Sequence, residues 1–309
     1  MSSKNIETNN AWEAKDLTGM HFINENMQGE SFLRSLLDYC EFKSTDLSRA
    51  AFSQAGVQGV QFKKVNLDKS LFHNTLMAQT NFNACNLERT HFRSVRGHNA
   101  EFIGSNLHNV CIMGCDLSKS SFNNVKAKNI KITLSAFQNC LMKNIDCTAA
   151  EMNSVNFMMA HLDNAWFFKA QLIWVEFIEM SAINTVFVGS NIINTQFNGS
   201  DLRGSNFHGA SIKGVTFNGA DLRSVNFNNL KIEESFLGAT ADFEGADLTG
   251  ASFDGVDLSI LNLTKEQLAS LSKTGQPTPI SWRTPAEEKD RLVPDPLKKI
   301  FNNDRTLKN

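Results

Sequence analysis

A strict five-residue period of large apolar residues restricts the possible folds of this chain more than any other feature. In residues 200–222, SDLRGSNFHGASIKGVTFNGADL, the large residues are Leu202, Phe207, Ile212, Phe217 and Leu222. We call these residues centres. A small residue stands two positions before each centre, and the other three positions are mostly polar or Gly. From Leu17 to Leu237 the period holds without a slip over 45 centres, of which 41 are Phe, Leu, Ile, Met or Val.

This period excludes ordinary helices and strands. Five residues of α-helix turn through about 500°, so the centres would drift around the axis. Successive centres on a strand would point to opposite faces, because side chains alternate with a period of two. The centres share one interior if each pentad forms one side of a square coil. Coils of about 20 residues that stack about 4.8 Å apart predict an all-β solenoid of about 12 coils.

Phenylalanine adds a ten-residue period to the frame. Of the 24 Phe residues, 21 are centres, and Phe alternates with aliphatic centres along most of the chain. In a four-sided coil this alternation stacks Phe on two opposite sides and smaller residues on the other two. The phase changes between Phe122 and Phe137. After one inserted residue between Leu237 and Phe243, the frame is expected to resume and to run to Leu263.

The pentads DLRGS, ADLRS and ADLTG in this stretch resemble the pentapeptide-repeat family, whose motif is A(D/N)LXX. The resemblance covers about residues 15–263 and implies a right-handed quadrilateral parallel β-helix. Members of the family are as a rule not enzymes. The best-understood ones bind DNA gyrase as elongated DNA mimics, and others are secreted bacterial effectors or scaffolds. Residues 93–100 and 126–150 depart from the motif, and a polar bulge is expected at Gly97.

The sequence divides into three parts. Residues 1–15 are a polar N-terminal segment, residues 16–263 are the β-helix, and residues 264–309 are a C-terminal tail. A capping box from Thr264 to Gln267 predicts a short helix that ends near Gly275, and 284–287 and 295–296 are further helix starts. Because an open solenoid end needs a cover, the tail is expected to cap the rod. The alternative is a homodimer through this tail, which the gyrase-binding members of the family suggest.

Composition gives no sign of nucleic acid or membrane as a partner. The chain carries 30 basic and 32 acidic residues, so no global field favours nucleic acid. No signal peptide is visible, and no apolar run approaches the roughly 20 residues of a membrane span. Five of the six Cys residues occupy small or centre positions, as buried free thiols do. These features predict a reduced, cytoplasmic protein, with leaderless secretion as an effector left open.

No sequence motif for catalysis is present. The chain lacks a phosphate-binding Gly-rich loop, HExxH and GxSxG, so we expect no enzyme activity and no cofactor. Cys111 and Cys115 form the only close Cys pair and lack further ligands, so no metal site is expected. All seven His residues fall at outward positions.

Charge is distributed unevenly between the two halves of the frame. Residues 16–145 hold 14 basic and 10 acidic side chains, whereas residues 146–263 hold 5 basic and 14 acidic ones. In the basic half, Arg49, Lys69 and Arg89 are 20 residues apart and should form one column. That column would suit an anionic partner, or it is a solvated face balanced by neighbouring carboxylates.

The strongest departure from the frame is apolar. Between Phe157 and Ile193, outward positions that should be polar hold Met158, Met159, Trp166, Phe168, Ile173, Trp174, Ile178, Val186, Val188 and Ile193. Spacing by 20 residues places these side chains in columns on three contiguous sides. We call them the apolar belt and interpret them as a surface for a protein partner or a dimer. Two alternatives are that a terminus covers the belt through Trp12, Trp282, Ile300 or Phe301, or that the coil breaks down locally.

The sequence therefore predicts a non-catalytic, protein-binding scaffold. In this hypothesis a rigid rod presents the apolar belt to a protein partner, as a bacterial scaffold or a secreted effector. The alternative is a DNA mimic that binds DNA gyrase or another topoisomerase and gives protection from gyrase inhibitors. The acidic second half and the tail favour that alternative, and its incomplete acidic surface opposes it.

Overall fold

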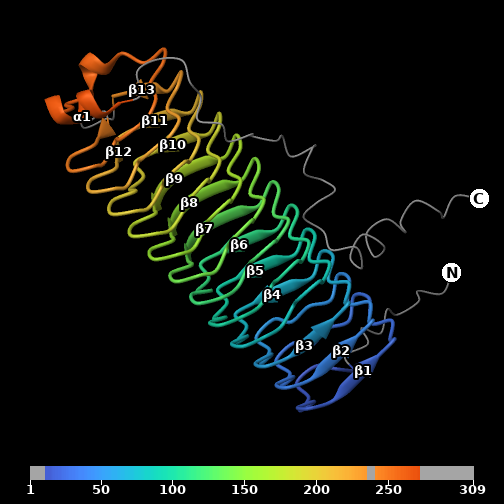
Figure 1. Cartoon of the computed structure of the whole chain (residues 1–309). Coiled ribbons are helices and arrows are strands. Elements are labelled where there is room, and N and C mark those ends of the chain that lie inside the picture. The colour runs from blue at the N-terminus through green and yellow to red at the C-terminus, as the bar shows by residue number, and fades with distance from the viewer. Residues whose placement is uncertain (1–10, 235–240, 272–309) are drawn as a thin grey trace, which may run out of the picture.

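The computed structural model describes residues 11–234 and 241–271 and shows one continuous parallel β-solenoid (Figure 1). Each centre returns to the same side of the coil after 20 residues, as the pairing of Phe22 with Phe42 and of Phe42 with Phe62 shows. The rod makes about 11 turns, close to the 12 expected. We name its four sides after the centres of one coil: Phe22, Met27, Phe32 and Leu37.

Short parallel strands line three of these sides. The strands are β1 (His21–Ile23), β2 (Glu41–Lys43), β3 (Gln61–Lys63), β4 (Leu71–His73), β5 (His91–Arg93), β6 (Cys111–Met113), β7 (Lys131–Ala136), β8 (Glu151–Asn156), β9 (Gln171–Glu176), β10 (Asn191–Ile193), β11 (Ser211–Lys213), β12 (Val215–Thr216), β13 (Lys231–Glu233) and β14 (Ala241–Asp242). β1–β3 form a sheet on the Phe22 side, and β4–β11 with β13 form a nine-stranded sheet on the Phe32 side. β12 and β14 pair on the Leu37 side. Isolated parallel bridges continue the same register elsewhere.

The interior is built as the period predicts. Centres from Leu17 to Phe227 are buried, and so are the small residues two positions before most of them. Phe rings stack on opposite sides, for example Phe22 on Phe42 at 4.7 Å between centroids, and meet edge-to-face across the core. The rings change sides between Phe122 and Phe137, whose planes are tilted by 54°. The all-β solenoid prediction is therefore confirmed.

Buried hydroxyl and thiol groups connect adjacent coils. Thr75 donates to the carbonyl of Phe52 at 2.8 Å, and Thr185 donates to the carbonyl of Leu162 at 2.8 Å. Cys140 repeats the same contact with Leu117, again 23 residues earlier in the chain. Small polar residues are therefore tolerated in the core, because many of them donate to a main-chain carbonyl of the preceding coil and others, such as Ser190, donate to a carbonyl of their own coil.

Each corner of the coil is a tight turn whose residue two positions after a centre has a positive φ. We call this the turn position. Gly and Asn occur there often, as the left-handed conformation favours. The side chain at a turn position points away from the core, so a column of turn residues forms each edge of the rod.

Inside the rod, two sequence expectations are wrong. Gly97 does not form a bulge: its N–H donates to the carbonyl of Asp116 at 2.8 Å, and the turn keeps the regular pattern. The insertion near Leu237 adds six residues to one coil, since Phe217 stacks on Phe243 at 5.0 Å. Phe243 thus occupies the side that Leu237 was expected to fill. Leu237 itself lies outside the described residues.

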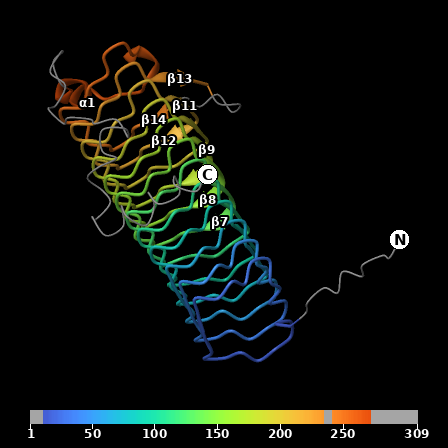
Figure 2. The same ribbon diagram turned by 90° about the vertical axis from the view of Figure 1, so that its right-hand side faces the viewer.

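The two ends of the described rod are covered by local structure. At the first coil, Trp12 packs against Phe22 and Phe32. At the last coil, the 3₁₀ helix η1 (Leu258–Ile260) ends the regular frame before Leu263, and helix α1 (Lys265–Ser270) follows. Thr264 and Gln267 form the expected capping box, and α1 ends earlier than predicted. Gln267 Nε2 also donates to the carbonyl of Phe243 at 2.8 Å, which attaches α1 to the coil. Figure 2 shows α1 at this end of the rod.

Candidate functional site

The apolar belt occupies three adjacent sides of the rod, in columns set by the coil register. Trp166 bridges to Val186 on the Met27 side, and Ile173 pairs with Ile193 between β9 and β10 on the Phe32 side. On the Leu37 side, the Met159 N–H donates to the carbonyl of Ile178 at 3.0 Å. The coil is regular through this region, so the belt does not mark a local breakdown.

Exposure differs strongly among the ten belt residues. Trp174 is 58% exposed and Met159 is 49% exposed, whereas Val186 is buried at 4%. The other seven side chains, Met158, Trp166, Phe168, Ile173, Ile178, Val188 and Ile193, are half-buried. The exposed apolar surface therefore centres on Trp174.

The belt divides into two patches at the corner between the Met27 and Phe32 sides. Lys169 and Gln171 are exposed there, and Lys169 Nζ lies 5.2 Å from the ring centroid of Phe168. This cation–π contact places a positive charge beside the apolar residues of the Met27 side. The Phe32 and Leu37 sides carry the larger apolar surface.

Leu134 extends this surface, although the apolar belt of residues 157–193 does not include it. It is 64% exposed and occupies the same turn column as Trp174, two coils earlier, with Ser154 between them. We call Leu134, Ile173, Trp174, Ile193 and Met159 the Trp174 patch. In the sequence, Leu134 is recognisable as a large apolar residue at a turn position, but it precedes residues 157–193, which contain the apolar belt.

Large residues at these turns are unfavourable for the backbone. Leu134, Met159 and Trp174 have φ values of 50°, 58° and 54°. A positive φ is costly for a bulky side chain, and such positions elsewhere in the rod are often Asn or Gly. Three bulky apolar side chains therefore project from the rod at positions where the local conformation does not favour them.

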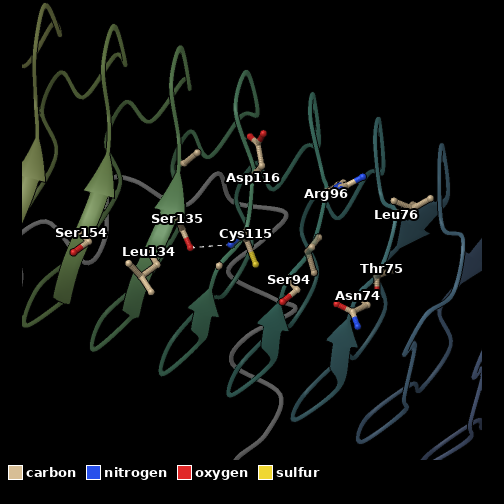
Figure 3. A pocket seen from close by; sticks show the side chains of 13 residues that line it. Asn74, Thr75, Leu76, Ser94, Arg96, Cys115, Asp116, Leu134, Ser135 and Ser154 are labelled. Atoms are coloured by element: carbon tan, nitrogen blue, oxygen red, sulfur yellow. Dashed lines mark hydrogen bonds between the residues drawn. The ribbon is translucent and has the colours of Figure 1, made fainter.

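A shallow groove lies next to the patch, at the corner between the Phe32 and Leu37 sides (Figure 3). It encloses about 830 Å³. It is lined by Asn74, Thr75, Leu76, Ser94, Val95, Arg96, Gly114, Cys115, Asp116, Leu134, Ser135, Ala136 and Ser154. Leu76 and Leu134 stand towards its two ends, and the turn column between them holds only Ser94 and Gly114. The groove exists because these two turn residues are small.

No described terminal residue covers the Trp174 patch. Trp12, one proposed cover, lies at the first coil against Phe22 and Phe32. Trp282, Ile300 and Phe301, the other proposed covers, lie outside the described residues.

The predicted anion-facing column is balanced by carboxylates. Arg49, Lys69 and Arg89 share one turn column on the Met27 side, as expected. Arg89 donates two hydrogen bonds to Asp68 at 3.0 Å each, and Lys69 Nζ lies 4.0 Å from the same carboxylate. This pairing matches the solvated-face alternative.

Aspartate and arginine also alternate in the acidic half. On the Phe22 side, Arg203 contacts Asp201 at 2.6 Å and Asp221 at 3.5 Å. Arg223 contacts Asp221 at 2.6 Å, and this hydrogen bond lowers the pKa of the Asp221 carboxyl. The arginines offset much of the negative charge of this side, where a DNA mimic needs a dense row of unpaired anions.

Within residues 11–234 and 241–271, no group of three His, Cys, Asp or Glu side chains is placed to hold a metal ion. The same part of the chain contains six free cysteines, of which five are buried and Cys111 is half-buried. Burial raises the pKa of Cys85 and Cys140 to about 12 and that of Cys115 to about 11. None of these buried thiols is suited to act as a nucleophile at neutral pH.

We expect one thiol per chain to react with a maleimide under native conditions at pH 8. A pKa raised from 9.0 to about 12 lowers the thiolate fraction of Cys85 or Cys140 about 1,000-fold, and burial also blocks access. Mass spectrometry of the labelled chain should show a single adduct at Cys111 and six adducts after unfolding. A Cys111→Ser chain is the control and should stay unlabelled while folded. Native labelling of Cys85 or Cys140 would contradict the buried arrangement.

No helix among the described residues is long and apolar enough to cross a membrane. Two family models match the sequence: "Pentapeptide repeat region" over residues 45–122 and 160–237, and "Pentapeptide repeats (8 copies)" over residues 240–264. No curated protein matches the chain.

Several solved structures are similar at low identity. One is HetL, a pentapeptide repeat protein involved in heterocyst differentiation regulation from the cyanobacterium Nostoc sp. strain PCC 7120. It is 15% identical over 79% of this chain and 91% of HetL, with a TM-score of 0.25. Full-length QnrB1, a plasmid-mediated fluoroquinolone resistance protein, is 17% identical over 76% of this chain and 94% of its own, with a TM-score of 0.24. Rfr23 from the cyanobacterium Cyanothece 51142 is 18% identical over 50% of this chain and 88% of its own, with a TM-score of 0.17.

Proposed function

Because the chain belongs to the pentapeptide-repeat family, we propose that it is a non-catalytic scaffold that binds a protein partner through the Trp174 patch. The observation that carries this proposal is the exposure of Trp174, at 58%, on a turn position that does not favour a bulky residue. Trp is the residue type most enriched at the energetic centres of protein interfaces. A rigid support also favours binding, because a patch on a rigid rod loses little conformational entropy when a partner docks.

The geometry of the patch supports a protein rather than a small molecule as the partner. Trp174 projects from the edge of the rod and lines no part of the groove, and Leu134 stands at the side of that open groove rather than in an enclosed cavity, whereas small-molecule sites are usually concave. The half-buried Ile173 and Ile193 next to them widen the apolar surface along the Phe32 side. A surface of this kind is typical of the centre of a protein interface, with polar residues at its rim.

The DNA-mimic alternative receives no support from the acidic half. Arg203 and Arg223 offset the Asp column on the Phe22 side, so a row of free carboxylates at phosphate spacing is not formed there. Dimerisation through the C-terminal tail stays a prediction, because residues 272–309 lie outside the described part of the chain. A gyrase supercoiling assay separates the two functions: inhibition by the purified chain would favour the mimic, and an unchanged rate favours the scaffold.

Affinity capture with matched variants tests the proposal. The purified full chain, a Trp174→Asp variant and an Asn164→Asp variant are used as baits in a lysate of the source cells. Asn164 is the control because it occupies the equivalent turn position, with a φ of 58°, on the Phe22 side away from the patch. We expect at least one protein to be captured by the wild type and by Asn164→Asp and to fall at least tenfold with Trp174→Asp. Identical protein sets for all three baits would refute the proposal.

A further inference from the structure

We propose that one partner of the Trp174 patch is a second copy of this chain, docked antiparallel so that Trp174 of each copy enters the groove over Gly114 of the other. The inference rests on the proposed function, because it names a partner for the same surface. It is carried by the order of side chains in one turn column and by the position of the boundary between the two charged halves.

The turn column on the edge between the Phe32 and Leu37 sides alternates large and small residues. One coil apart, it reads Ser94, Gly114, Leu134, Ser154, Trp174 and Asn194. Gly114 leaves open space: a Cβ added there would meet no atom closer than Ser94 Oγ, at 4.0 Å. The column thus offers two projecting residues, Leu134 and Trp174, and two gaps, at Gly114 and Ser154.

A two-fold axis perpendicular to the rod and between Leu134 and Ser154 fits these residues into the gaps. Such an axis lies in the interface, so each column of one copy faces the same column of the other in the reverse direction. Trp174 then lies over Gly114 of the second copy, and Leu134 lies over Ser154 of the second copy. The two-fold symmetry generates each of these two contacts twice in the dimer. The groove of about 830 Å³ beside Gly114 is large enough to receive the indole ring.

The neighbouring columns agree with this arrangement. In the column just after the Phe32-side centres, Met113 is 39% exposed and would face Ile173 of the second copy. In the column just before these centres, Lys131 would face Glu151 of the second copy. Within one chain these two residues already form an ion pair at 2.8 Å, so the dimer would contain a four-charge cluster of alternating sign.

The proposed axis coincides with the boundary between the charged halves. Residues 16–145 hold 14 basic and 10 acidic side chains, and residues 146–263 hold 5 and 14. Antiparallel docking about an axis between Leu134 and Ser154 places each basic half along an acidic half, whereas parallel docking places like halves together. One facing pair, Asp116 and Glu176 of the second copy, is repulsive, and Arg96 lies one coil away in the same column as Asp116.

The proposed dimer interface is short along the rod, and its length determines the affinity that we expect. Six turn residues from Ser94 to Asn194 span five coil spacings, about 24 Å along the rod. An interface of this length is smaller than the roughly 800 Å² per partner of standard complexes, so we expect dissociation in the micromolar range.

Sedimentation equilibrium of the full chain over micromolar concentrations tests the dimer. We expect Trp174→Asp to weaken dimerisation by at least ~30-fold, as for a central interface residue. Gly114→Gln should weaken it as well by filling the gap, and Gln54 and Gln79 show that this turn conformation accepts Gln. Gly209→Gln is the matched control, since Gly209 has a φ of 61°, open space around its Cβ and a place on the Met27 side. Circular dichroism melting confirms that each variant is folded.

A distance measurement tests the orientation. A spin label is attached at Asn194→Cys in a Cys111→Ser background, and pulsed dipolar spectroscopy reports the distance between the two labels of a dimer. Antiparallel docking separates the labels by five coil spacings along the rod, about 24 Å. Labels at the same height, as in a parallel dimer, would overturn the proposed arrangement.

The outcomes separate this inference from the proposed function. A wild-type chain that stays monomeric at 100 times the expected dissociation constant overturns the inference, while selective loss of a captured protein with Trp174→Asp would still support the scaffold. A dimer that persists in both Trp174→Asp and Gly114→Gln also overturns it, because another surface such as the tail would then form the dimer. A Trp174-dependent, antiparallel dimer supports the inference even if the capture experiment yields no other protein.

Discussion

Replacing Phe167 by Ala should lower the free energy of unfolding by about 3–5 kcal/mol. Phe167 is fully buried, stacks on Phe187 at 5.2 Å between centroids and meets Phe177 edge-to-face at 5.9 Å. Its loss leaves a cavity that a coil fixed by the main-chain hydrogen bonds of its neighbours cannot close. Chemical denaturation followed by circular dichroism measures the change. Because each coil contacts only its neighbours, separate unfolding of the coils after Phe167 would appear as an additional transition.

The adjacent residue provides the control. Phe168 points outward, is half-buried and contacts Lys169, so Phe168→Ala should cost no more than about 1 kcal/mol. The two neighbouring Phe residues are therefore expected to differ severalfold in their contribution to the free energy of unfolding, because only Phe167 is a centre of the five-residue frame. Equal effects of the two substitutions would contradict the inward placement of the centres.

Restoring the repeat motif at Gly97 should destabilise the rod. Gly97 is a centre, and the frame favours Leu there, but the space is already filled by its neighbours in the adjacent coils. A Cβ at this position would lie 2.8 Å from Leu117 Cδ2 and 3.0 Å from Met77 Cγ. Overpacking of this kind costs about 1–3 kcal/mol, so Gly97→Leu should lower the midpoint of denaturation.

A second substitution separates overpacking from a backbone effect. Met77→Ala removes the side chain whose Cγ and Cε would be closest to the new residue after Leu117. We expect the double variant Met77→Ala, Gly97→Leu to be more stable than Met77→Ala alone, because the introduced leucine side chain then fills the cavity. If Gly97→Leu alone is as stable as the wild type, the neighbours of Gly97 do not occupy its space as the structure describes.

The sequence predicts the interior well because one geometric condition governs it. A residue such as Phe22 or Phe177 has to point inward on every turn, and only a four-sided coil achieves this with a period of five. The small residues follow from the same condition, since they lie beside the centres in a narrow core. Outward residues obey no such condition, so their arrangement needs the structure.

The insertion shows where counting pentads fails. Leu237 and Phe243 each fit a frame of five, and nothing local in the sequence says which of them forms the fourth side of the coil. Stacking decides: Phe243 lies 5.0 Å from Phe217 and 5.9 Å from Phe227, so it completes the ring ladder. A contact between residues 26 positions apart is invisible to a five-residue pattern.

The five-residue frame identifies apolar residues at outward positions, but it does not say which of them are exposed. Trp166 and Trp174 are both outward residues in the frame, yet Trp166 stands beside a centre and is half-buried. Trp174 stands at a turn and is exposed. The distinction between these outward positions arises from the positive φ of the turn, which also explains why Leu134 was missed.

The change of phase between Phe122 and Phe137 has a mechanical consequence for the rod. Before it, ring stacks reinforce the Phe22 and Phe32 walls; after it, they reinforce the Met27 and Leu37 walls. Tightly packed stacks resist compression, so each section is stiffer against bending in one transverse plane than in the other. The two planes differ by a quarter turn. A rod built from two such sections resists bending in both transverse planes. This property suits a scaffold that holds its binding surface at a fixed position.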